Sequence, residues 1–359
     1  MNIEILLSFS LLYFGFGIRA LVFVYALSGI GSLAIMGFFV RRYDPNIHIN
    51  PFRARFSALP DIFSLGAAMQ VLGGLALFSA VIDSFVFARY NGLAFAGLYA
   101  MARTAAERAQ GAAHQAFGAL APASADLFAR GEHEKLARVY ALTLRMCFLG
   151  CLYVFSFMAI NPDYTMVFLE GAKYDPASAM ALRWLCVALT FHTLTGPGSS
   201  MMRGAGMTVR EMVYHVITIV TFLALFHAAR HAGLGEVWQV QSYSAALSLG
   251  SFVFVLIANR FFRAPWHTPF LGLLPLAIAA PVLAWCVTRG FDAAGLRAVL
   301  PFTRGGAVVA LGILGSIYTG LFAAAVWFLP GLLMEERRQL LKLVPGGKKI
   351  AARLLPDAG

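Results

Sequence analysis

The polar side chains best suited to bind a ligand are concentrated in one apolar stretch, residues 93–120. A helix turns by about 100° per residue, which places Glu107, Gln110 and His114 within about 40° of Arg103. The other polar side chains lie about 100–140° away, and the opposite arc is mainly alanine. We therefore expect one face to meet water or a ligand and the other to meet lipid or a closely packed helix. The polar set is Arg103, Thr104, Glu107, Arg108, Gln110, His114 and Gln115.

The composition indicates that this stretch lies in a membrane. Of the 359 residues, 60% are hydrophobic and 13% are charged, whereas a soluble domain carries about 25% charged residues. The apolar residues form about ten blocks, most of them close to the roughly 20 residues that cross a bilayer. We therefore predict an all-α polytopic membrane protein with about ten transmembrane helices. The expected spans are 3–16, 19–40, 62–87, 93–120, 139–160, 177–202, 211–229, 238–259, 269–288 and 306–329.

The basic residues of the loops predict the orientation. The formal net charge is +11, and no nucleic-acid motif accounts for it. Alternate loops and the tail hold about 17 Lys and Arg residues on one side and about 7 on the other; the richer side faces the cytoplasm. Both termini are therefore expected in the cytoplasm. No cleavable signal peptide is expected, because residues 2–40 lack a basic start and a small-residue cleavage site.

Charged groups at membrane depth are costly unless they face a cavity or a partner. Arg103 and Glu107 are four residues apart and can form an ion pair. The favoured interpretation is a polar face lining a hydrated path. An internal ion pair within a network between helices, or an Arg103 side chain that reaches one interface, stays open. Further polar groups in the expected spans are Asp83, Arg145, Arg183 and His192.

The sixth expected span contains a candidate hinge at Gly196, Pro197 and Gly198. Proline removes a helical hydrogen bond and clashes with the preceding turn. Broken helices in transporters often lie beside the substrate path, although a plain kink absorbed by packing is an equal alternative.

The residues give no indication of catalysis or metal binding. Ser199, Ser200 and His192 show no arrangement of nucleophile and base. The cysteines lie inside apolar blocks without metal-ligand spacing and are expected to pack as small apolar side chains. We expect no enzyme activity, metal or cofactor beyond a coupling H⁺ or Na⁺. The cysteines are Cys147, Cys151, Cys186 and Cys286.

Short motifs between Asp83 and Met207 resemble a known family. Asp83 closes a span, and the later motifs follow in the family's order over about 125 residues. On these residues the chain resembles the polysaccharide flippases of the multidrug/oligosaccharidyl-lipid/polysaccharide exporter superfamily, which move lipid-linked oligosaccharides of the O-antigen type. The motifs are Gly97-Leu98-Tyr99-Ala100-Met101-Ala102, Pro122-Ala123-Ser124 with Gly131-Glu132, Leu169-Glu170-Gly171-Ala172-Lys173-Tyr174, and Arg203-Gly204-Ala205-Gly206.

The resemblance implies a domain organisation. The family has two six-helix lobes around a central cavity, often with two extra C-terminal helices. Here residues 61–265 correspond to the second lobe and 266–330 to the extra pair. Residues 1–60 are a remnant of the first lobe, lacking about four helices, and 331–359 form a basic cytoplasmic tail. A truncated product, a misassigned start or completion by oligomerisation would each explain the difference.

The resemblance also implies a function: flipping of a polyprenyl-diphosphate-linked oligosaccharide across the bacterial inner membrane by alternating access, for surface polysaccharide such as lipopolysaccharide or exopolysaccharide. Arginines would bind the diphosphate. Amides and His114 would meet sugar hydroxyls, and Glu107 or Asp83 would carry the coupling ion. The binding candidates are Arg103, Arg108, Gln110, His114, Gln115, Arg145 and Arg183.

Two other functions stay open. One is a cation-coupled small-molecule exporter of the same superfamily. The other is a membrane scaffold in a polysaccharide assembly complex, whose polar helix face serves helix contacts. The expected partners are the lipid-linked glycan, membrane lipids and polysaccharide polymerase or assembly proteins, with no nucleic acid.

Overall fold

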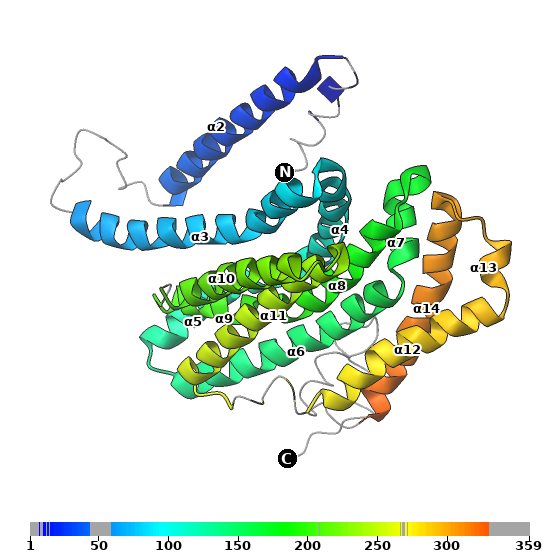
Figure 1. Ribbon diagram of the computed structural model, residues 1–359. Coiled ribbons are helices and arrows are strands. Elements are labelled where there is room, and N and C mark those ends of the chain that lie inside the picture. Colours follow the sequence, from blue (N-terminus) through cyan, green and yellow to red (C-terminus); the bar gives the residue numbers. More distant parts are fainter. Residues whose placement is uncertain are drawn as a thin grey trace. The chain divides into compact units, whose positions relative to one another are not determined.

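The computed structural model describes residues 15–43, 59–207, 209–265 and 272–329, with Leu7, Ser10, Leu11, Tyr13, His267 and Phe270. Helices and connecting turns make up these residues, and no strand occurs among them (Figure 1). The all-α prediction is confirmed. The elements are α2 (Gly17–Tyr43), α3 (Leu59–Asn91), α4 (Leu93–Phe117), α5 (Leu120–Ala129), α6 (His133–Ile160), α7 (Pro162–Glu170), the 3-10 turn η3 (Gly171–Lys173), α8 (Pro176–Thr193), α9 (Thr195–Gly204), α10 (Val209–His231), α11 (Glu236–Phe261), α12 (Leu274–Ala293), α13 (Leu296–Val299) and α14 (Arg304–Phe328).

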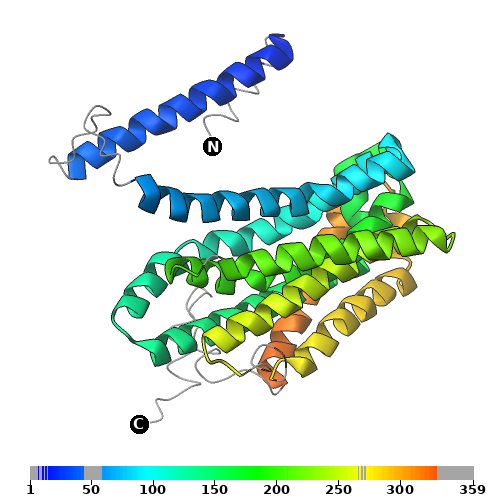
Figure 2. The ribbon, with the colours of Figure 1, turned by 60° about the vertical axis from the view of Figure 1, so that its left-hand side comes forward.

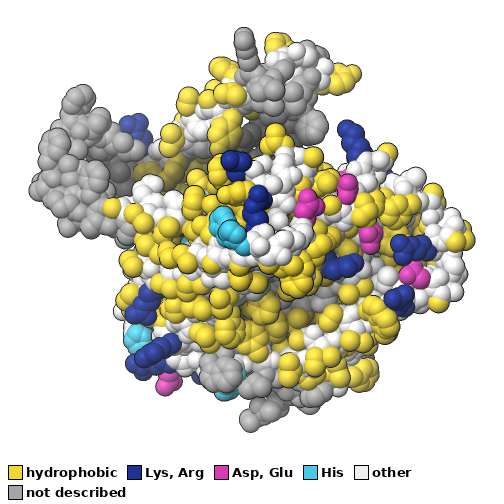
Figure 3. All heavy atoms as spheres, viewed as in Figure 1, with side chains coloured by type: hydrophobic (Ala, Val, Ile, Leu, Met, Phe, Trp, Pro, Cys, Tyr) yellow, Lys and Arg dark blue, Asp and Glu magenta, His cyan; other side chains and the backbone are white. Residues whose placement is uncertain are grey.

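Among the described residues, eight helical segments are long and apolar enough to cross a membrane, which indicates a multi-pass membrane protein. They lie in α2, α3, α6, α8 with α9, α10, α11, α12 and α14. Helix α4 is not among them, since its charged and amide side chains lower its hydropathy. Hydrophobic side chains also cover much of the described surface in Figure 3, as expected where the surrounding solvent is lipid rather than water. The first expected span, 3–16, lies largely outside the described residues.

The chain divides into two units, Met1–Ser64 and Leu65–Gly359. The first contains α2, most of whose described side chains are exposed. The second is a helix bundle in which α8 packs against α4, α6 and α11. Helices α10 and α11 run side by side, as Figures 1 and 2 both show. The bundle core is largely aromatic and aliphatic, with Tyr99, Phe87 and Phe222 fully buried.

Helix α5, which follows the end of α4, is held by close contacts with α9. The Ser124 hydroxyl of α5 donates to the Ala121 and Met201 carbonyl oxygens, at 2.9 and 3.1 Å. A side chain at Gly204 would collide with the Ala121 carbonyl, so glycine lets α9 approach α5. Two of the quoted motifs, 122–124 and 203–206, therefore meet at one helix contact. The connection between the expected spans 93–120 and 139–160 is mostly helical, because α5 and the start of α6 occupy it.

The candidate hinge lies just after a real break in the helix. Helix α8 ends at Thr193 and α9 begins at Thr195, so the break falls at Leu194 rather than at Pro197. Gly196 lies against the Phe117 ring, and a side chain at Gly198 would come within 3.0 Å of Ala258. The two glycines therefore have a packing role, whether or not the segment also moves.

Helices α12 and α14 pack on α6 and α7. The Thr288 hydroxyl of α12 donates to Asn161 Oδ1 at 2.9 Å, and the Tyr153 and Tyr318 rings stack with centroids 5.5 Å apart. Gly171 has a φ of 63° and adjoins the Arg304 side chain, which donates to the Leu169 carbonyl oxygen at 3.0 Å.

The contact between α10 and α11 gives a stability prediction. A methyl group at Gly250 would collide with Thr218 Oγ1 and lie 2.8 Å from the Tyr214 carbonyl oxygen. Gly250→Ala should therefore lower the thermal midpoint of the detergent-solubilised protein. Gly320→Ala in α14 is the matched control, because nothing lies within 4 Å of its added methyl group. The control should be neutral or stabilising by up to about 1 kcal/mol. A Gly250→Ala midpoint equal to that of the control would contradict this helix contact.

Candidate functional site

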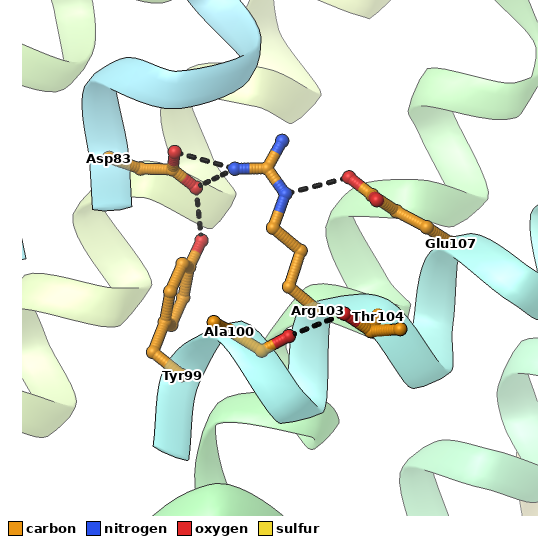
Figure 4. Close-up of polar contacts among 6 residues, drawn as sticks. All are labelled: Asp83, Tyr99, Ala100, Arg103, Thr104 and Glu107. Carbon is orange, nitrogen blue, oxygen red and sulfur yellow. Dashed lines mark hydrogen bonds and ion pairs between the residues drawn. The ribbon is translucent and has the colours of Figure 1, made fainter. Parts of the chain in front are cut away.

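A buried carboxylate of α3 and an arginine of α4 form the centre of the site (Figure 4). One Arg103 terminal nitrogen lies 2.5 Å from both Asp83 carboxylate oxygens. Arg103 Nε donates to Glu107 Oε1 at 2.7 Å, and the Tyr99 hydroxyl donates to Asp83 Oδ2 at 2.5 Å. Tyr99, Arg103 and Glu107 are spaced by four residues, so one face of α4 presents all three to the site.

The surroundings fix the position of the Arg103 guanidinium. The Asp83 side chain is fully buried, Arg103 is 14% exposed and Glu107 is 47% exposed. The guanidinium carbon also lies 5.8 Å from the centroid of the Tyr243 ring of α11, within range of a cation–π interaction. A carboxylate with this burial requires a charged or hydrogen-bonded partner, and Arg103 and Tyr99 supply both. The ion pair between Arg103 and Glu107 that the sequence suggested is present, and Arg103 also pairs with Asp83, which the sequence did not indicate. Both Arg103 and Glu107 line a cavity.

The cavity has a volume of about 210 Å³ and is enclosed by α3, α4, α8, α10 and α11. Its lining combines charged, imidazole and phenol groups with small apolar side chains from five helices. Glu107 reaches its exposed edge. The cavity is therefore a polar space within an apolar bundle. The lining residues are Ala76, Ser79, Ala80, Arg103, Glu107, Gln110, Leu185, Leu189, His192, Tyr214, His215, Tyr243 and Leu247.

Gln110 separates this cavity from a second, apolar one. Its amide nitrogen donates to Thr193 Oγ1 at 3.0 Å, and the residue contributes to both linings. The second cavity has a volume of about 360 Å³ and lies between α4, α6 and α8. Its wall includes Cys147 and Cys151, whose thiols are free. The two cavities thus meet at the Gln110 side chain.

The sequence prediction missed a second ion pair next to the cavity. Glu211 of α10 accepts hydrogen bonds from Arg203, at 2.5 and 2.8 Å, and from the Ser199 hydroxyl of α9. Its side chain is 2% exposed. His215 follows one helical turn later and lines the cavity. Glu211 and His215 are two polar residues spaced by four in an apolar span, and this spacing is the signal from which the pair could have been predicted.

Several predicted binding residues lie away from the cavity lining. Arg108 lies on the exposed side of α4, because it is 140° around the helix from Arg103. Arg183 is exposed and donates to the Ala159 carbonyl oxygen at 3.2 Å, while Arg145 is buried in α6. His114 and Gln115 belong to α4, but their side chains lie outside the described part of the structure. The cavity brings together Arg103, Glu107 and Gln110 and adds His192, for which the sequence indicated no specific role.

The chemistry of the cavity is that of ligand binding. Its groups offer a guanidinium, a carboxylate, an amide, two imidazoles and two phenols. Within the described residues, no group of three or more His, Cys, Asp or Glu side chains is placed to hold a metal ion. No protein-family model and no curated protein matches the sequence.

The Asp83–Arg103 pair gives a second stability prediction. Arg103→Met leaves the Asp83 carboxylate buried without its cation, which typically costs about 3–5 kcal/mol. Glu107→Gln should cost less than about 1 kcal/mol, because exposed ion pairs contribute little. The double variant Asp83→Asn/Arg103→Met should recover much of the loss. Thermal midpoints in detergent measure all three, and an Arg103→Met midpoint equal to that of the unchanged protein would show that the pair is not needed.

Cysteine accessibility tests whether water reaches the cavity. A membrane-impermeant maleimide should label Glu107→Cys readily and Gln110→Cys more slowly. Ala102→Cys should stay protected, because Ala102 is fully buried. Failure to label Glu107→Cys in the intact membrane would mean that the polar face is sealed between neighbours. In the background for these variants, alanine replaces Cys147, Cys151, Cys186 and Cys286.

Proposed function

We propose that this protein moves a polyprenyl-diphosphate-linked oligosaccharide across the bacterial plasma membrane by alternating access. The observation that carries the proposal is a cavity inside a bundle of apolar helices, lined by Arg103, whose side chain is only 14% exposed. Ionisable groups at membrane depth are costly and mark substrate or ion pathways. The motif resemblance supplies the substrate class.

The cavity is suited to the charged headgroup of such a substrate rather than to its sugars. Guanidinium groups bind phosphate oxygens with directed hydrogen bonds. The second terminal nitrogen of Arg103 bonds to neither Asp83 nor Glu107 (Figure 4). Gln110 and His192 add polar groups next to it. A volume of about 210 Å³ is too small for an oligosaccharide. The glycan would therefore extend past Glu107 toward the exposed edge.

The proposed architecture follows the family arrangement. Helices α3 to α11 form the second lobe, α12 and α14 form the extra C-terminal pair, and α2 with residues 3–16 belongs to the first lobe. Counting α4 and the first segment gives about ten spans, with both termini in the cytoplasm. The exposed side of α4 carries Gly97, Thr104 and Arg108.

A cation-coupled small-molecule exporter is the second candidate, and one observation favours it. With both carboxylates ionised, Asp83 and Glu107 outnumber the single guanidinium of Arg103. A cavity with an excess negative charge favours an organic cation over a phosphate. Measured efflux of organic cations, with normal surface glycan in a deletion strain, would decide for this candidate.

Glycan export tests the leading proposal. In cells whose surface glycan depends on this protein, Arg103→Lys and Glu107→Gln should each reduce export at least about tenfold. Arg103→Lys keeps the charge but loses the planar donor pattern that fits phosphate oxygens. Surface glycan is measured by labelling intact cells, and membrane abundance by immunoblotting. Arg130→Gln is the control, because Arg130 is exposed and forms an ion pair with the exposed Asp126. Normal export by both variants would remove these residues from the mechanism.

A further inference from the structure

Two histidines from different helices reach the same cavity. His192 of α8 and His215 of α10 both belong to the lining, and the Tyr214 ring lies near both. The Tyr214 centroid lies 3.9 Å from that of His215 and 6.0 Å from that of His192. His215 is 5% exposed, and its Nδ1 atom is buried without a hydrogen-bond partner. His215 therefore contributes to the cavity wall an imidazole with one unpartnered nitrogen, which can take up a proton.

The charged groups around the two histidines can be counted helix by helix. Helix α4 contributes Arg103 and Glu107, and α3 contributes Asp83 behind Arg103. This set has one more carboxylate than guanidinium. On the other side of His215, Glu211 and Arg203 pair with each other. The neutral polar groups that face the pair are Tyr214, Tyr243 and Ser251, whose hydroxyl lies 3.4 Å from His192 Nδ1.

We propose that His192 and His215 form a proton-binding pair that makes the cavity receptive to a diphosphate anion. With both imidazoles neutral, the cavity carries an excess negative charge and repels an anion. With both protonated, the excess becomes positive, and both ring nitrogens of each imidazole become donors. The inference rests on the proposed function, because it assigns the condition under which that site accepts its headgroup.

The consequence is cooperative binding of protons and anion. An anion that binds better to the protonated cavity must raise the proton affinity of the pair by the same factor. The bound protons then balance part of the charge of the anion within the low-dielectric bundle. The ordinary titration of histidine lies between pH 5 and 8. Burial disfavours the charged form of an imidazole, so the bound anion is what stabilises the two protons in the cavity.

Binding to the purified full-length chain tests the proposal. The probes are citronellyl diphosphate and inorganic pyrophosphate, titrated by calorimetry at about pH 5.5 and about pH 8.5. Binding should be at least about tenfold tighter at the lower pH, because two charges in the cavity change. Both probes become more negative as the pH rises, which alone would strengthen their attraction to a cation, so the expected direction cannot come from the probe.

The double variant His192→Gln/His215→Gln should lose most of the pH dependence. Titrations in buffers of different ionisation enthalpy measure the protons taken up when the probe binds. At about pH 7 the unchanged protein should take up about one proton more per bound probe than the double variant. His227→Gln is the matched control, because His227 is an exposed histidine of the same helix. If the double variant does not fold, the single variants His192→Gln and His215→Gln should each lose part of the dependence.

The possible outcomes separate this inference from the proposed function. Equal affinity at the two pH values overturns the histidine pair but leaves a diphosphate site. Loss of the dependence in Glu107→Gln, with its retention in the histidine variants, also overturns it by assigning the proton to Glu107. No binding at any pH overturns both. A preference for the citronellyl form supports a lipid-linked ligand, and equal binding of pyrophosphate supports a site for the diphosphate group alone.

Discussion

The bonds between Asp83 and Arg103 are the constraint on which the rest of the site depends. A fully buried carboxylate on α3 requires a cation, and Arg103 reaches it from α4 at 2.5 Å. This pair joins two consecutive helices and directs the remaining guanidinium edge toward Glu107 and the Tyr243 ring. The same interaction that holds the helices together therefore limits how much positive charge Arg103 can offer a ligand.

Close backbone approaches place the other walls of the cavity. Gly250 brings α11 against Thr218 of α10, and Gly204 brings α9 against Ala121. These approaches set the position of Tyr214 and His215 relative to α4. The family-like motifs contribute at the same points, since Tyr99 bonds to Asp83 and Ser124 lies beside Gly204. Several of the motif residues are thus explained by packing, independently of any substrate.

Hydropathy and helical periodicity were sufficient to predict the fold class and the polar face of α4, because both are local properties of the chain. They placed Arg103, Glu107 and Gln110 on one side, where the cavity lies. Periodicity could not identify what faces that side. Tyr243 and His215 reach the cavity only through the packing of α10 and α11. The helix break at Leu194, three residues before Pro197, was also missed, because proline fits the first turn of a helix and does not mark the break itself.

The charge balance decides how the cavity can act. Arg108, Arg145 and Arg183 do not line it, so the positive charges that the sequence suggested for the cavity lie elsewhere in the bundle. What remains is one guanidinium held by two carboxylates, with two imidazoles nearby. With both imidazoles neutral this arrangement favours a cation, and with both protonated it favours an anion. The identity of the ligand and the protonation of His192 and His215 are therefore one question, because the same charge balance determines both.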